Sequence, residues 1–243
     1  MIRELTRLDD LVAACGDDVF VMWAAQGMAP GVRVFTSGEA VAVASPSLSR
    51  RDRLAVGGPL VGVVPLVRHA LAEVGPSYRP VGEEALVRGL AERIDRLRFS
   101  AAFDWMDTSG PAPGDPGKAG WLSGDDLPDV TAMLAGANPD SYAVPGVPGV
   151  RRWAGVRTDA GALASVGAEA WTAPGVGFIA GVATAEQERG RGHAESVCRF
   201  LLTTLLAEQG RVALMVDSWN RSAIAVYERL GMRRWGVAAA HVE

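Results

Sequence analysis

The clearest hydrophobic pattern in this chain is a strand-like run that leads through a glycine-rich turn into a long apolar helix. The strand-like run covers residues 175–184, and the helix pattern covers residues 192–209. Apolar residues at 211–217 then predict a short buried strand, and those at 220–230 predict a helix. Gly231 follows that helix pattern directly and is expected to end the helix. The second half of the chain therefore alternates strands and helices.

Further elements precede and follow this segment. A helix is predicted at 127–134, and two antiparallel strands at 151–157 and 162–171 are joined by a turn at Asp159–Gly161. A final strand or hairpin falls within 232–242. The resulting order, β-β-β-α-β-α-β, predicts an α/β (α+β) fold with a mixed, mostly antiparallel sheet flanked by helices.

The first half has a weaker pattern of short strands and helices. Helices are predicted at 3–15, 62–74 and 83–97, and strands at 32–35, 40–44 and 101–106. Because Ser, Gly and Pro are dense at 109–117, we expect a boundary there. The sequence predicts a smaller α/β domain at 1–110, a linker at 111–118 and a second domain at 119–243. Whether the first domain is a degenerate copy of the second stays open, because the sequence reveals no repeat.

Composition narrows the classes of protein that fit. The chain has 243 residues, of which 49% are hydrophobic and 21% charged, as expected for a folded protein. A net charge of −4 argues against general nucleic-acid binding. No apolar run has the length of a membrane span, and the first residues lack the apolar core of a signal peptide. Two cysteines make no disulfide framework, and the three histidines lack metal-ligand spacing, so we expect a cytoplasmic protein without a metal.

The glycine-rich turn carries the most specific chemistry. It reads Arg189-Gly190-Arg191-Gly192-His193-Ala194. The first N–H groups of a helix have no intrahelical acceptor, and the helix dipole favours an anion there. Glycine lets the backbone approach a phosphate closely, and two arginines add positive charge. A dinucleotide fingerprint does not fit, since Glu195 stands where its third glycine would be. By itself, the turn fits an ordinary surface loop as well as a phosphate site. The residues that follow it in the chain are needed to favour a phosphorylated ligand.

That context resembles a known family. A strand, the Arg-x-x-Gly-x-Ala turn at 189–194, a helix, a strand and Asn-x-x-Ala-x-x-x-Tyr-x-x-x-Gly-Met at 220–232 follow in order. This arrangement resembles the GCN5-related N-acetyltransferase (GNAT) superfamily over roughly residues 119–243. Ala194 replaces a frequent glycine, and His193 replaces a more usual aliphatic residue. The two-part layout is similar, less specifically, to FR47-like and glycine N-acyltransferase-like proteins.

The resemblance implies acetyl-CoA, or coenzyme A, as the co-substrate. In the family, pantetheine lies beside the strand that precedes the turn, which assigns Val182, Ala183 and Thr184 to the pantetheine and thioester. The residues implied to hold the pyrophosphate are Arg189, Gly190, Arg191, Gly192, His193 and Ala194. Asn220 is implied to touch the cofactor arm, although a plain helix N-cap would have the same sequence.

Two residues are candidates for catalysis. The resemblance implies that Tyr227 protonates the departing thiolate, whereas the alternative is a tyrosine packed in the core. Glu169 lies on a strand next to the cofactor strand and is a candidate general base, whereas its alternative is a solvent-facing residue. His193 or water could also remove the proton. Tyr142 and the loop 139–149 occupy the place of the family's acceptor loop.

The sequence therefore predicts an enzyme that moves an acetyl group from acetyl-CoA to a primary amine by direct transfer in a ternary complex. The acceptor is a small molecule or a peptide, and we expect no nucleic-acid or membrane partner. Use of a longer acyl-CoA is one alternative. A CoA-binding regulatory or interaction module without turnover is another. The sequence leaves the acceptor and the oligomeric state open.

Overall fold

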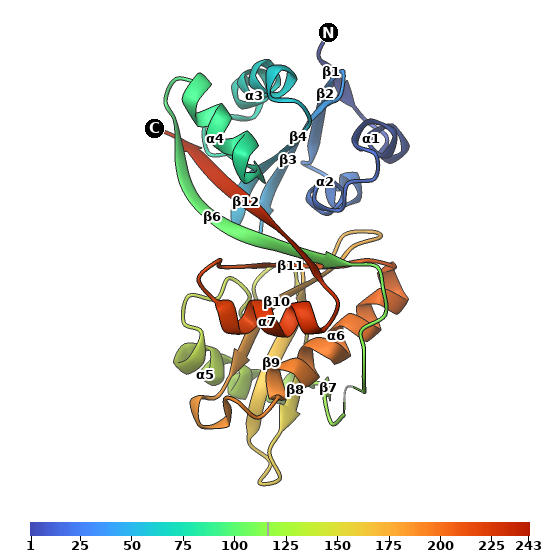
Figure 1. The fold of residues 1–243 in the computed structure, drawn as a ribbon, viewed down its shortest axis with the longest axis vertical. Coiled ribbons are helices and arrows are strands. Elements are labelled where there is room, and N and C mark those ends of the chain that lie inside the picture. The colour runs from blue at the N-terminus through green and yellow to red at the C-terminus, as the bar shows by residue number, and fades with distance from the viewer. Residues whose placement is uncertain (116) are drawn as a thin grey trace. The chain divides into compact units, whose positions relative to one another are not determined.

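The computed structural model describes residues 1–115 and 117–243 and falls into two compact units (Figure 1). The first unit comprises Met1–Trp105 and Trp235–Glu243, and the second comprises Met106–Arg234. The predicted linker at 111–118 contains Pro116, which lies outside the described residues. The last strand groups with the first unit, whereas the predicted division placed it in the domain at 119–243.

The first unit is a mixed sheet with helices packed on it. Its elements are β1 (Arg3–Leu5), α1 (Leu8–Cys15), α2 (Val19–Ala25), the 3-10 turn η1 (Gln26–Met28), β2 (Arg33–Ser37), β3 (Ala40–Leu48), β4 (Arg51–Gly57), α3 (Leu60–Val74), β5 (Arg79–Glu83), α4 (Glu84–Arg93), β6 (Leu97–Thr108) and β12 (Arg233–Val242). The strand order is β1-β2-β3-β4-β5-β12-β6. Strands β4 and β5 are parallel, whereas the pairs β1–β2, β2–β3, β3–β4 and β5–β12 are antiparallel.

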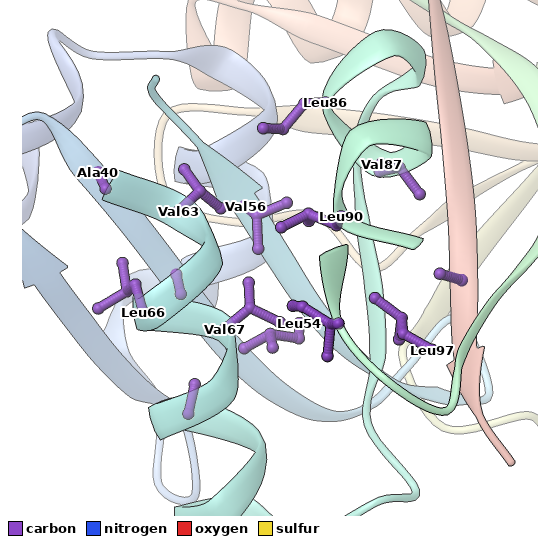
Figure 2. Packing of buried hydrophobic residues seen from close by; sticks show 14 of the residues in the cluster. Ala40, Leu54, Val56, Val63, Leu66, Val67, Leu86, Val87, Leu90 and Leu97 are labelled. Carbon is purple, nitrogen blue, oxygen red and sulfur yellow. The ribbon is translucent and has the colours of Figure 1, made fainter. Parts of the chain in front are cut away.

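Strand β3 separates the two faces of this sheet, because successive side chains of a strand point in opposite directions. Ala40, Ala42 and Ala44 pack in a core with α3 and α4. Ser45 lies on the opposite face of the strand and donates its hydroxyl to the carbonyl of Ala24 in α2. Figure 2 shows the α3/α4 core, whose labelled members include Leu54, Val56, Val63, Leu66, Val67 and Leu90. Helices α3 and α4 therefore cover one face of the sheet, and α2 covers the other.

The second unit holds the predicted acetyltransferase segment. Its elements are β7 (Gly120–Trp121), the 3-10 turn η2 (Gly124–Asp126), α5 (Leu127–Ala137), β8 (Val150–Arg157), β9 (Leu163–Ala170), β10 (Gly177–Thr184), the 3-10 turn η3 (Glu186–Glu188), α6 (His193–Gln209), β11 (Val212–Val216) and α7 (Arg221–Arg229). The strand order is β11-β10-β9-β8-β7. Strands β10 and β11 are parallel and the other three pairs are antiparallel, which confirms the predicted mixed, mostly antiparallel sheet.

Helices α6 and α7 pack on the sheet of the second unit. Leu201, Leu202 and Leu205 of α6 are fully buried and share a core with Ile179 of β10 and Leu214 of β11. These leucines recur at the spacing of one helix face, which explains why the apolar pattern at 192–209 predicts the helix well. The packing fixes the start of α6 at the end of the sheet toward which β10 runs.

Both units contain the same succession of elements. In the first unit it is β2-β3-β4-α3-β5-α4, and in the second it is β8-β9-β10-α6-β11-α7. In each, three antiparallel strands precede a helix that leads to a parallel strand. The repeat is visible in the fold although the sequence does not reveal it.

Candidate functional site

Strand β10, the predicted cofactor strand, diverges from its parallel neighbour β11. Their register ends at the pair Ile179–Leu214, although β10 continues to Thr184. Val182, Ala183 and Thr184 therefore lie in the part of β10 beyond its pairing with β11. A strand that leaves its neighbour presents backbone donors and acceptors, to which an extended ligand arm can bind.

A β-bulge lies within this diverging part of β10. The register with β9 shifts between positions 180 and 183, and Gly181 adopts a left-handed φ of 63°. A Cβ on Gly181 would lie 2.8 Å from the ring of Trp153 and 3.1 Å from Ala143, so a side chain does not fit there. Because Ala143 belongs to the loop 139–149, the predicted acceptor loop packs directly against the bulge. Sequence reasoning did not single out Gly181, since a glycine within a strand pattern gives only a general hint of a bulge.

The turn that follows β10 has the backbone geometry of an anion site. Gly190 has a φ of 76°, and Gly192, the N-cap of α6, has a φ of 83°. A Cβ on either glycine would meet no heavy atom within 4 Å, so the space outside the turn is open. The first amides of α6, from His193 and Ala194 onward, lack an intrahelical acceptor and lie at the positive end of the helix dipole. These features suit a phosphate group.

Glu188 connects the side chains of Arg191 and His193 in this turn. Its carboxylate lies 3.2 Å from the Arg191 guanidinium and 3.2 Å from Nε2 of His193. The Glu188 side chain is only 13% exposed, whereas that of Arg191 is 62% exposed. Glu188 therefore holds both side chains close to the start of α6, while Arg189 is exposed. The sequence carries no signal for Glu188, because only the folded turn brings it to residues 191 and 193.

A negative charge at the helix start is offset by two arginines. Glu195 lies in the first turn of α6, where its carboxylate would repel a bound anion. Arg199 and Arg229 approach that carboxylate to 2.7 Å and 2.8 Å. The hydrogen bond from Arg229, with further contributions from Arg199, lowers the pKa of Glu195 below its usual value. The charged carboxylate is thus paired with two guanidinium groups, and the start of α6 stays favourable for an anion.

Tyr227 is buried in the core of the second unit. Its side chain lies among residues of α6, α7, β10 and β11 and is 6% exposed. Burial raises the pKa of Tyr227 well above 10.0, and the neighbouring Cys198 thiol raises it further. A phenol with a raised pKa keeps its proton at neutral pH and can act as a hydrogen-bond donor or acid. Both interpretations of Tyr227, core residue and proton donor, are compatible with this environment.

Asn220 caps α7. Its Oδ1 accepts hydrogen bonds from the Ala223 N–H at 3.2 Å and from the Ser222 hydroxyl at 3.1 Å. This is the geometry of an N-cap, so the helix-capping interpretation accounts for Asn220. The capping uses the oxygen alone, and the amide nitrogen is a further donor at the end of β11.

Glu169 is buried and lies in a network of ion pairs. Its side chain is 2% exposed, and its two oxygens accept hydrogen bonds from Arg151 at 3.3 Å and from Arg152 at 2.5 Å. Arg152 also forms an ion pair with Glu208, which lies in the last turn of α6. At 1.5 Å per residue, that turn lies about 22 Å along the helix from His193. These contacts fit a structural ion pair, and the role of Glu169 as a base stays a prediction.

Comparison with known families identifies this segment. Residues 148–232 match the model of the Acetyltransferase (GNAT) family. They form a GNAT acetyltransferase domain. The matched range contains the diverging strand, the turn at 189–194, Asn220 and Tyr227. A domain of this family implies an enzyme that takes an acyl group from acyl-CoA.

Solved structures show the same fold over nearly the whole chain. A GCN5-related N-acetyltransferase from Kribbella flavida has a TM-score of 0.60 at 19% identity and covers 92% of this chain and 95% of its own. An acetyltransferase of the GNAT family from Colwellia psychrerythraea has a TM-score of 0.57 at 16% identity and covers 99% of both chains. No curated protein matches the sequence. The structural likeness extends beyond the GNAT domain and includes the first unit.

The described residues also bear on metal binding and on membrane insertion. Within residues 1–115 and 117–243, no three His, Cys, Asp or Glu side chains are grouped to hold a metal ion. None of the helices described in these ranges combines the length and apolar character that crossing a membrane requires.

Proposed function

We propose that this chain transfers an acetyl group from acetyl-CoA to a primary amine, by direct attack in a ternary complex. The observation that carries the proposal is the continuity of β10, which runs from the diverging part at Val182–Thr184 into the turn at 189–194. One segment could then bind both the pantetheine arm, through strand backbone, and the pyrophosphate, through the amides at the start of α6. The family match supports the same co-substrate.

The proposed reaction is a direct transfer and needs no covalent enzyme intermediate. The amine nitrogen attacks the thioester carbonyl, and backbone N–H groups at the bulge around Gly181 stabilise the oxyanion. The C–S bond then breaks, and the CoA thiolate takes a proton from Tyr227, whose raised pKa keeps the phenol protonated. The proton lost by the amine passes to water, and the phenol regains its proton from solvent. No side chain is assigned as a general base.

The first unit is proposed to bind no CoA. Its sheet has the same succession of elements, but the turn after β4, Gly57–Gly62, contains no arginine or lysine. We interpret it as a degenerate copy of the GNAT unit. A titration of CoA should accordingly give one equivalent per chain.

The experiment is an assay of CoA thiol release from acetyl-CoA, and from longer acyl-CoAs, over a panel of small amines, peptides and aminoglycosides. Calorimetric titration of CoA onto the same protein runs beside it. We expect one CoA site and amine-dependent thiol release that is fastest with acetyl-CoA. Tight CoA binding without release from any pair would support the binding module instead. If thiol release is faster with a longer acyl-CoA than with acetyl-CoA, the transferred group is that longer acyl group and not acetyl.

A further inference from the structure

The indole ring of Trp153 packs directly against the bulge in β10. A Cβ on Gly181 would lie 2.8 Å from Cη2 and 3.2 Å from Cζ3 of Trp153, so the six-membered ring faces the backbone of the bulge. Ala143 lies beside it, at 3.1 Å from the same Cβ position. Trp153 is 3% exposed and Ala143 is fully buried. One face of the bulge is therefore closed by a wall of these two side chains.

Helix α6 closes the opposite face at the same level of the sheet. Gly167 of β9 lies across from the bulge. A Cβ on Gly167 would lie 3.0 Å from Leu201 and 3.2 Å from Val197, which are both fully buried in α6. The side chain of Val182, which follows Gly181, lies on this face and packs against the same core. Little space is left on this side, because core side chains are close-packed.

The pairing of the two parallel strands forms a third boundary. Strands β10 and β11 are paired at Ile179 and Leu214 and separate only beyond them. In the proposed function the thioester carbonyl lies at the bulge around Gly181. Its acyl group then has to fit between this pairing and the two closed faces. An acetyl group places one methyl there, whereas every longer acyl group adds carbons that need further space.

The indole of Trp153 includes a polar group that contributes no hydrogen bond. Its Nε1 is buried and has no partner among residues 1–115 and 117–243. A buried N–H without a partner is unfavourable, and a wholly apolar side chain would pack at this position without that cost. The bulk of the indole, and not its N–H, is therefore what this position uses.

We propose that Trp153, with Ala143 beside it, restricts the transferred acyl group to acetyl. The inference rests on the proposed function, because it takes the thioester to lie at the bulge. Trp153 is a specificity-determining residue in this role, since its ring fills the space into which the carbons beyond the methyl of a longer acyl chain would extend. One extra methylene in a hydrophobic pocket changes the specificity constant about 10- to 200-fold.

The test measures the acyl-chain preference of the full chain and its variants. Acetyl-CoA and butyryl-CoA are compared as ligands by calorimetric titration, and as donors by thiol release with the fastest amine of the panel. For the wild type we expect butyryl-CoA to bind at least about tenfold more weakly than acetyl-CoA. Trp153→Leu should remove most of this difference, and neither this variant nor Trp153→Phe should change the Kd of CoA itself.

Two further variants keep the test decisive. Trp153→Phe retains an aromatic ring while it removes the unpaired N–H, so it is the milder change and should remove part of the difference. Trp121→Leu is the matched control, because Trp121 lies in the same sheet but contacts Phe200 of α6, at 5.1 Å between ring centroids. It should keep the wild-type preference for acetyl-CoA. Thermal unfolding shows that each variant is folded.

The results separate this inference from the proposed function. If folded Trp153→Leu and Trp153→Phe prefer acetyl-CoA as strongly as the wild type, or if Trp121→Leu loses the preference equally, Trp153 does not set the acyl length. Equal use of both donors by the wild type would overturn the inference and leave acyl transfer intact. Absence of thiol release would instead contradict the transfer, while the two Kd values and their response to Trp153→Leu would still decide the role of the wall. A wild type that binds neither acyl-CoA would overturn both.

Discussion

The two ends of α6 offer a matched pair of glycines that can test the phosphate turn. Gly192 is the N-cap with a φ of 83°, and Gly210 is the C-cap with a φ of 78°. A Cβ on either residue would meet no heavy atom within 4 Å. In Gly192→Ala and Gly210→Ala, the left-handed backbone should cost about 1–2 kcal/mol each. We expect both variants to lose Tm by roughly 2–4 °C for each kcal/mol.

Only one of the two substitutions should change the affinity for CoA. The Cβ of Gly192→Ala enters the open space beside the first amides of α6, where the proposed pyrophosphate accepts hydrogen bonds. A hydrogen bond to a charged group contributes about 1.5–3 kcal/mol, so losing one should raise the Kd for CoA about 10- to 100-fold. Gly210→Ala carries the same strain at the opposite end of the helix, and its Kd should stay at the wild-type value.

The assay is calorimetric titration of CoA onto each folded variant, with thermal unfolding measured alongside. The pair separates ligand contact from stability because the expected strain is common to both. An unchanged Kd in Gly192→Ala would show that the turn does not contact the phosphates. An equal loss of affinity in Gly210→Ala would show that strain, and not contact, reduces binding.

Two further predictions concern the core beneath the site. Tyr227→Phe should reduce the maximal rate by about 10²–10⁴-fold with little change in CoA affinity, since the ring still packs while the proton donor is gone, and a full-rate variant would assign the proton to another group. Burial raises the pKa of the Cys198 thiol to about 12 from 9.0, so the folded state retains a proton that the unfolded state loses. The free energy of unfolding should therefore fall as pH rises from 9.0 to about 12. Urea unfolding across that range should show a smaller fall in Cys198→Ala, and an identical pH dependence in both proteins would contradict the assignment.

The sequence predicts the GNAT domain well because its elements carry complete local signals. The helix expected at 192–209 is observed at His193–Gln209, and the helix expected at 220–230 is observed at Arg221–Arg229. Each has an apolar face of helical period and a cap, Gly210 for the first and Asn220 for the second. Where periodicity and capping agree, the boundaries differ by only about one residue.

The first unit is harder to predict because its elements carry weak or misleading patterns. The helix expected at 3–15 is divided into β1 and α1, which starts at Leu8. Strand β4 begins with charged residues, Arg51-Asp52-Arg53, which conceal its alternation. Helix α2 is short and buried around much of its surface, including residues 20–25, so it has no polar face to mark a helical period. Tertiary packing determines the secondary structure of these segments, and the local hydrophobic pattern does not reveal that packing.

The residues of the candidate site fall into the same two groups, those with a local sequence signal and those that depend on tertiary contacts. The turn at 189–194 and the Asn220–Tyr227 spacing are local, so the sequence locates them. The role of Glu188 depends on how η3 folds back on the start of α6, and the contacts of Glu169 depend on strand pairing across β8 and β9. Because those contacts form between segments, the sequence alone left Glu169 as a candidate base beside a solvent-facing alternative, and it gave no signal for Glu188.

The two units together separate what the fold supplies from what the side chains supply. In both, three antiparallel strands lead through a turn and a helix to a strand that pairs in parallel with the third. In the GNAT domain the third strand runs into Arg189–Ala194, which provides free amides and positive charge. In the first unit it runs into Gly57–Gly62, which contains no arginine or lysine. The succession of elements is common to both, so the residues of the turn decide whether a unit can hold a phosphate. A repeated fold is therefore compatible with the proposed CoA site in one unit and with none in the other.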